Sequence, residues 1–76
     1  MSNDYRQGQF LDKLAKRIAE LRRSKHITQE RLAADAGIDR VALANIETCK
    51  RRPTVTTVYR IARALNVKVE EVFKNL

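Results

Sequence analysis

The 76-residue sequence is poor in turn-forming residues, because it contains only two glycines and one proline. Such a composition leaves little room for β-hairpins. The sequence also lacks any long apolar run, so we expect neither a membrane span nor a signal-peptide core. Hydrophobic residues make up 43% and charged residues 33% of the chain, which suits a helical, soluble fold and argues against disorder.

Chemically reactive side chains are equally scarce. The chain has one histidine, one cysteine and two serines, Ser2 and Ser24, which provide no catalytic triad and no metal-ligand set. We therefore expect no enzyme activity, no metal and no cofactor. The single cysteine cannot form an internal disulfide, which favours a reducing, cytoplasmic setting.

Acidic residues are fewer than basic ones, and the formal net charge is +7. A polyanion is the partner that such a charge favours, and nucleic acid is the usual one. Charge alone leaves simple solubility equally open. The length predicts one domain, residues 1–76, which buries only about 60% of its unfolded surface and gains stability from oligomerisation.

The stretch TQERLAADAGIDRVALANIE, from Thr28 to Glu47, predicts two short helices joined by a tight turn. Gly37 lies between them, where a chain leaving a helix enters the left-handed conformation that glycine adopts at low cost. Ala33 lies where the helices would cross, and its small side chain lets their backbones approach. Leu43 and Ile46 supply the apolar face of the second helix. This spacing is typical of a helix-turn-helix.

The same stretch resembles the DNA-binding half of phage Cro and lambda-type repressors and the small controller proteins of restriction–modification systems. The resemblance extends from about Leu14 to about Phe73. It implies an all-α, five-helix, lambda-repressor-like domain of the Cro/XRE type, with its helix-turn-helix at residues 28–47. The implied function is sequence-specific regulation of transcription on double-stranded DNA.

Apolar periodicity and capping residues also predict five helices. Residues 1–8 are polar, and we expect them to be frayed. Thr28, Asp39 and Thr54 are natural N-caps, and Asn66 suits the left-handed position after a helix. The predicted helices span residues 9–25, 29–36, 40–47, 55–65 and 69–74.

One arc of the third predicted helix carries side chains suited to base recognition, and by the resemblance this arc enters the major groove. Arginine forks onto guanine O6 and N7, asparagine pairs with adenine N6 and N7, and small apolar groups touch the thymine methyl. A merely solvated face is the alternative, but Val41 is an unusually apolar choice for one. The predicted base-reading residues are Arg40, Val41, Ala44 and Asn45.

Basic residues flank this unit on both sides, and they predict contacts with DNA phosphates. The resemblance places Gln29 on a phosphate at the helix N-terminus, which is itself an anion site. It also places the loop after the third helix along the DNA backbone. The predicted phosphate-binding residues are Gln29, Arg23, Lys50, Arg51 and Arg52. Loose surface charge is the alternative for these cations.

The resemblance predicts a structural pair and reveals two departures. Arg22 and Glu47 would face each other and orient the third helix. His26 stands where the family usually has glycine, so it must tolerate a positive φ or end its helix differently. Thr48-Cys49 replaces the usual Asn-Gly or Arg-Gly, which leaves a strained turn or another shape. The role of Cys49, including a redox switch beside DNA, is open.

A single unit of this size covers too little DNA for strong specific binding, which predicts a homodimer on a pseudo-palindromic operator. We expect its interface at Val69, Val72 and Phe73 and at the end of the fourth helix. Closure of the monomer core is the alternative role of these three residues.

The alternative function is that of an antitoxin, which would need a toxin partner, or of a coactivator-type interaction module. The sequence leaves open whether RNA polymerase is a partner, which operator is bound and which gene is regulated. It also leaves open whether the context is a phage, a toxin–antitoxin or a restriction–modification system, and whether binding represses or activates transcription.

Overall fold

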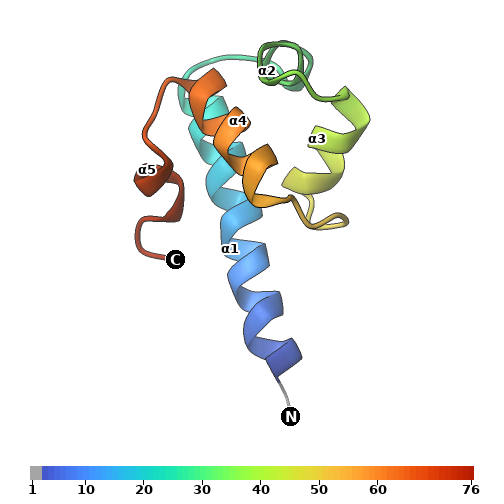
Figure 1. Ribbon diagram of the computed structural model, residues 1–76, viewed down its shortest axis with the longest axis vertical. Coiled ribbons are helices and arrows are strands. Elements are labelled where there is room, and N and C mark those ends of the chain that lie inside the picture. The colour runs from blue at the N-terminus through green and yellow to red at the C-terminus, as the bar shows by residue number, and fades with distance from the viewer. Residues whose placement is uncertain (1–2) are drawn as a thin grey trace.

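The computed structural model describes residues 3–76, which form five helices: α1 (Asn3–Ser24), α2 (Gln29–Ala36), α3 (Arg40–Glu47), α4 (Val55–Leu65) and α5 (Val69–Phe73). Helices α2 to α5 gather around the C-terminal half of α1, and the N-terminal turns of α1 project from this body (Figure 1). The described part of the chain contains no strand, so the predicted all-α class is confirmed. None of its helices is long and apolar enough to cross a membrane.

The ends of the helices follow the predicted chemistry at most positions. Thr28 Oγ1 accepts the backbone N–H of Arg31 at 3.0 Å, and Thr54 Oγ1 accepts that of Thr57 at 3.1 Å, as expected of N-caps. Gly37 adopts φ +71° after α2, and Asn66 adopts φ +60° after α4.

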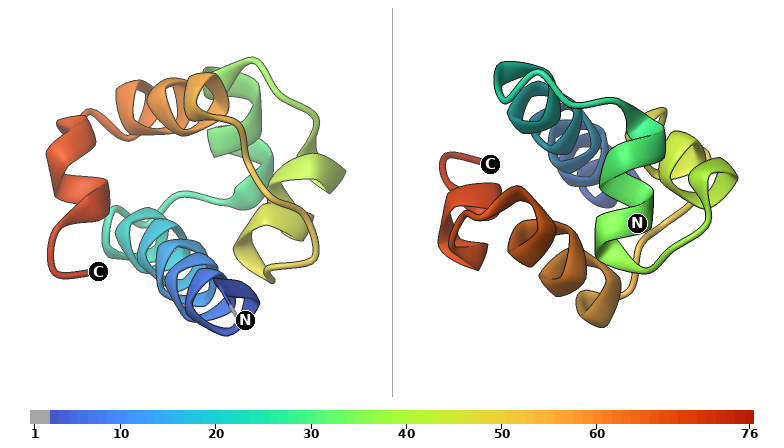
Figure 2. Two further views of the ribbon diagram at one scale, coloured as in Figure 1. Left: turned by 60° about the horizontal axis from the view of Figure 1, so that its bottom comes forward. Right: turned by 90° about the horizontal axis from the view of Figure 1, so that it is seen from above.

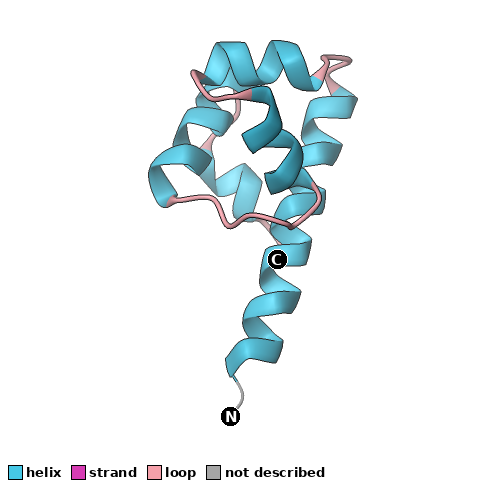
Figure 3. Cartoon of the chain, turned by 90° about the vertical axis from the view of Figure 1, so that its right-hand side faces the viewer, coloured by secondary structure: helices cyan, strands magenta, loops and turns pink. Residues whose placement is uncertain are grey.

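Two boundaries differ from the expectation. Asp39 has the extended backbone of an N-cap, yet its side chain makes no capping hydrogen bond within the described residues. Helix α1 begins at Asn3 instead of residue 9, so most of the segment expected to be frayed is helical. The apolar periodicity that located this helix starts only where α1 meets the core, and it therefore missed the projecting turns (Figure 3).

The core forms where α1, α2, α3, α4 and α5 meet. Helix α2 packs against both α3 and α4, and α5 packs against α1 and α4 (Figure 2). The largest fully buried side chains come from every helix: Ile18, Leu32, Leu43, Ile61, Leu65 and Val72. Ala33 is 2% exposed and lies within this cluster, as the close approach of α2 to its neighbours requires.

Candidate nucleic-acid interface

Helix α3 has one buried and one outward face. Leu43 and Ile46 are buried in the core, whereas Val41 is 55% exposed. The structure brings the four residues predicted to read bases onto the outward arc: Arg40 and Val41 are exposed, and Ala44 and Asn45 are half-buried. Val41 thus leaves more than half of an apolar side chain in water beside polar groups that can donate hydrogen bonds.

The last residue of α3 is buried and charged. Glu47 is 9% exposed, and its carboxylate receives Arg22 Nε at 2.8 Å on Oε2 and Arg22 Nη2 at 3.1 Å on Oε1. Arg22 Nη1 donates to the carbonyl oxygen of Ile27 at 2.9 Å. This two-bonded contact between a guanidinium and a carboxylate joins the end of α1 to the end of α3, and such pairs hold a defined geometry.

Gln29, expected on a phosphate, also belongs to this cluster. Its Nε2 donates to Glu47 Oε1 at 2.9 Å, so the side chain supports α3 directly. An amide carries two N–H donors, and one bond leaves the second for another acceptor. The sequence pattern indicated this residue but offered no sign of its contact with Glu47.

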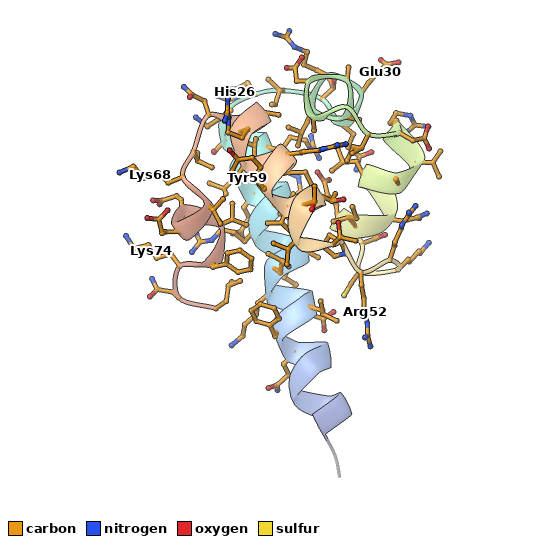
Figure 4. The ribbon with its side chains drawn as sticks, viewed as in Figure 1. His26, Glu30, Arg52, Tyr59, Lys68 and Lys74 are labelled. Carbon is orange, nitrogen blue, oxygen red and sulfur yellow. The ribbon has the colours of Figure 1, made fainter. Side chains whose placement is uncertain are left out.

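The loop after α3 carries the cations expected on phosphates. Lys50, Arg51 and Arg52 are exposed, and the side chain of Arg52 extends from the loop on the side of the molecule opposite Lys68 (Figure 4). The backbone N–H groups of Lys50 and Arg51 both donate to the carbonyl oxygen of Asn45, at 2.8 and 3.2 Å. The loop is therefore anchored to a residue on the predicted base-reading arc.

Cys49 begins this loop in the left-handed conformation, with φ +62°. A non-glycine residue pays a conformational cost there, so of the two expected outcomes the structure has the strained turn. Partial desolvation and the nearby Asp12 carboxylate raise the pKa of the exposed Cys49 thiol, while Arg52 lowers it. A raised pKa leaves less of the thiol ionised, and the thiolate is the nucleophilic form.

Arg23, also predicted to bind a phosphate, is exposed in the last turn of α1, on a different element from the loop of Lys50 to Arg52.

The turn after α1 ends at His26, which adopts φ +58°. Of the two outcomes expected for this position, the structure therefore has the positive φ. In the described part of the chain, no group of three His, Cys, Asp or Glu side chains could hold a metal ion.

The predicted dimer surface on α5 needs correction at Val72, which is fully buried inside the monomer and so closes its core. Val69 is half-buried against the same core, and its place in an interface stays a prediction. Phe73 is 38% exposed and stacks on Phe10 of α1, with ring centroids 6.2 Å apart. The spacing of apolar residues along α5 could not reveal that α1 and α4 already cover the inner side of this helix. An exposed aromatic pair, Phe10 and Phe73, remains.

Comparison with known protein families identifies the family to which this five-helix chain belongs. The helix-turn-helix family model matches residues 18–72, which include all of α2, α3 and α4. The chain belongs to the helix-turn-helix family, in its Cro/XRE branch. The resemblance drawn from residues 28–47 is thereby confirmed, and the family assignment points to a DNA-binding regulator.

Individual relatives agree with this assignment. Two proteins named as uncharacterised HTH-type transcriptional regulators are similar: one from Archaeoglobus fulgidus, 39% identical over 75% of this chain and 80% of its own, and one from Sinorhizobium fredii, 44% identical over 66% and 65%. Among solved structures, the restriction–modification controller protein C.AhdI from Aeromonas hydrophila is 33% identical, with a TM-score of 0.81 over 83% of this chain and 96% of its own. The controller protein C.Esp1396I is 31% identical, also with a TM-score of 0.81, over 86% and 84%.

Proposed function

We propose that this helix-turn-helix regulator acts as a homodimer that reads a specific double-stranded DNA site by placing α3 in the major groove. The exposed arc of α3 carries this proposal. Arg40 stands at the N-terminal end, Asn45 follows slightly more than one turn later, and Val41 is 55% exposed between them. An arginine, an asparagine and an apolar contact are the side chains suited to guanine, adenine and the thymine methyl.

The basic loop supports the proposal independently. Lys50, Arg51 and Arg52 are exposed directly after α3, and two backbone hydrogen bonds to Asn45 fix the start of this loop relative to the reading arc. Cations held at a fixed position beside a recognition helix set its register on the phosphate backbone. The similarity to two restriction–modification controller proteins favours a regulator of that kind.

Selection of bound sequences from random double-stranded DNA tests the proposal. We expect one preferred site with two related halves, whose centres lie about one helical turn, or 34 Å, apart. Binding of mixed DNA with no enriched sequence would instead support an interaction module that keeps the fold without reading bases. A single unpaired site would retain base reading and remove the homodimer.

A further inference from the structure

One face of α1 holds the end of α5 through two contacts. Phe10 stacks on Phe73, with ring planes 5° apart, and Arg17 Nη2 donates a hydrogen bond to the carbonyl oxygen of Lys74. Phe10 and Arg17 lie about two turns apart on α1 and therefore share a face of this helix. Two adjacent residues at the end of α5 are thus contacted by two residues of the same face of α1.

The short length of α5 explains why its end needs such contacts. The helix has only five residues, and a helix this short has little stability of its own. Val72 fixes its inner side in the core, where this side chain is fully buried. Lys74 follows the helix with an extended backbone, φ −67° and ψ 128°, and carbonyl groups at a helix end need partners from outside the helix. Arg17 provides such a partner immediately after Phe73.

Arg17 is a costly residue for the stability of the monomer alone. Its Nε is buried and has no hydrogen-bond partner among the described residues, and a buried donor without a partner costs free energy. A methionine would place an unbranched, flexible side chain there without any unpaired donor. The contribution of Arg17 to net stability therefore explains its presence poorly, whereas a role in fixing the position of the end of α5 explains it well.

We infer that Arg17 is a positioning residue for subunit contact, which holds the end of α5 so that Phe10 and Phe73 present their exposed rings to a second copy of this chain. The inference rests on the proposed homodimer. Phe10 is 42% and Phe73 38% exposed, so both rings leave apolar surface for a partner. In a two-fold dimer the same surface meets itself, and rings whose direction is fixed can satisfy this self-complementarity.

The first measurement concerns the position of α5. Arg17→Met removes the guanidinium, and we expect it to weaken the nuclear Overhauser effects between the rings of Phe10 and Phe73. Lys16→Met is the matched control, because it removes one positive charge from an exposed neighbouring position of α1 and should leave these effects unchanged. Nuclear Overhauser effects that Arg17→Met leaves at their wild-type strength would overturn the inference.

The second measurement separates positioning from stability. In the dilution limit, where the unfolding midpoint no longer depends on protein concentration, Arg17→Met should unfold close to wild type. The loss of one hydrogen bond is then offset by the removal of a buried, unpaired donor. Val72→Ala, which leaves a cavity in the core, should lower this midpoint clearly. A loss in Arg17→Met as large as that in Val72→Ala would reduce Arg17 to a structural residue of the monomer.

The third measurement is sedimentation at micromolar concentration, with and without the selected DNA site. Arg17→Met should dimerise several-fold more weakly than wild type and Lys16→Met. The double variant with Phe73→Ala should lose no more than Phe73→Ala alone, because both changes act on one contact. A dimer that Arg17→Met leaves intact, or additive losses in the double variant, would contradict the inference alone. Wild-type protein that stays monomeric on its DNA site would contradict the proposed homodimer and this role of Arg17 together.

Discussion

Gln29 donates a hydrogen bond to Glu47 at 2.9 Å, although these residues are the first of α2 and the last of α3. The accepting oxygen, Oε1, also receives Arg22 Nη2 at 3.1 Å. One buried carboxylate thus connects both helices of the helix-turn-helix to α1. Because three elements meet at Glu47, the angle at which α3 leaves the body depends on this side chain.

Replacement of Glu47 should therefore be costly. We expect Glu47→Ala to lower the free energy of unfolding by about 2–4 kcal/mol, because Arg22, whose side chain is only 12% exposed, loses its partner. Asp35→Ala is the matched control: it breaks the exposed pair of Arg31 and Asp35 and should cost less than about 1 kcal/mol. Thermal or urea unfolding measures both losses of stability. An equal loss of unfolding free energy in the two variants would contradict the special role of Glu47.

The loop cations should contribute affinity without sequence preference. Replacing Lys50 or Arg52 with alanine should weaken all DNA sites alike and reduce the slope of log K against log salt concentration by about 0.9 for each phosphate that the variant no longer neutralises. Lys68→Ala removes one charge from the other side of the molecule and should leave the slope unchanged (Figure 4). Identical slopes for all three variants would make the loop residues ordinary surface charge.

The exposed aromatic pair should distinguish association from folding. We expect Phe73→Ala to weaken the dimer in sedimentation at micromolar concentration and to cost the monomer less stability than Val72→Ala does, because the Phe73 ring is 38% exposed. Val72→Ala should instead destabilise the monomer by at least about 1.5 kcal/mol, since it removes two buried carbon atoms and leaves a cavity. A wild-type monomer in the presence of its DNA site would contradict dimerisation altogether.

The positive φ at His26 should make glycine the better residue there. His26→Gly should raise the free energy of unfolding by about 0.5–1 kcal/mol, because an L-residue in the left-handed region pays a steric cost that glycine avoids. Asn66→Gly, at φ +60°, should gain less, since asparagine tolerates this region better than histidine. Equal unfolding midpoints for wild type and His26→Gly would show that the turn carries no strain.

Base reading should be separable from phosphate binding at Arg40. Arg40→Ala should lose about 1–3 kcal/mol of affinity for the preferred site and relax the preference at one symmetric pair of positions. Binding to random DNA should fall far less, because the loop cations still bind phosphates. A base-by-base binding profile for wild type, Arg40→Ala and Asn45→Ala provides the measurement. Equal losses on specific and random DNA would reassign Arg40 to a phosphate.

Local chemistry made much of this fold predictable from the sequence. Thr28 and Thr54 cap their helices with their own hydroxyls, and Gly37 and Asn66 end helices with a left-handed residue. These preferences act over one turn of chain, so a single sequence states them directly. The apolar spacing of α4 likewise predicted its buried face, which consists of Val58, Ile61, Ala62 and Leu65.

The sequence by itself determined the five-helix order, most of the helix ends and the outward arc of α3, because these follow from the identity of neighbouring residues and the period of the helix. Only the tertiary structure decided that Val72 is covered while Phe73 stacks on Phe10, and that Gln29 joins the buried carboxylate of Glu47. Each of these interactions joins different helices. Whether such side chains meet depends on how those elements pack, which no local pattern specifies.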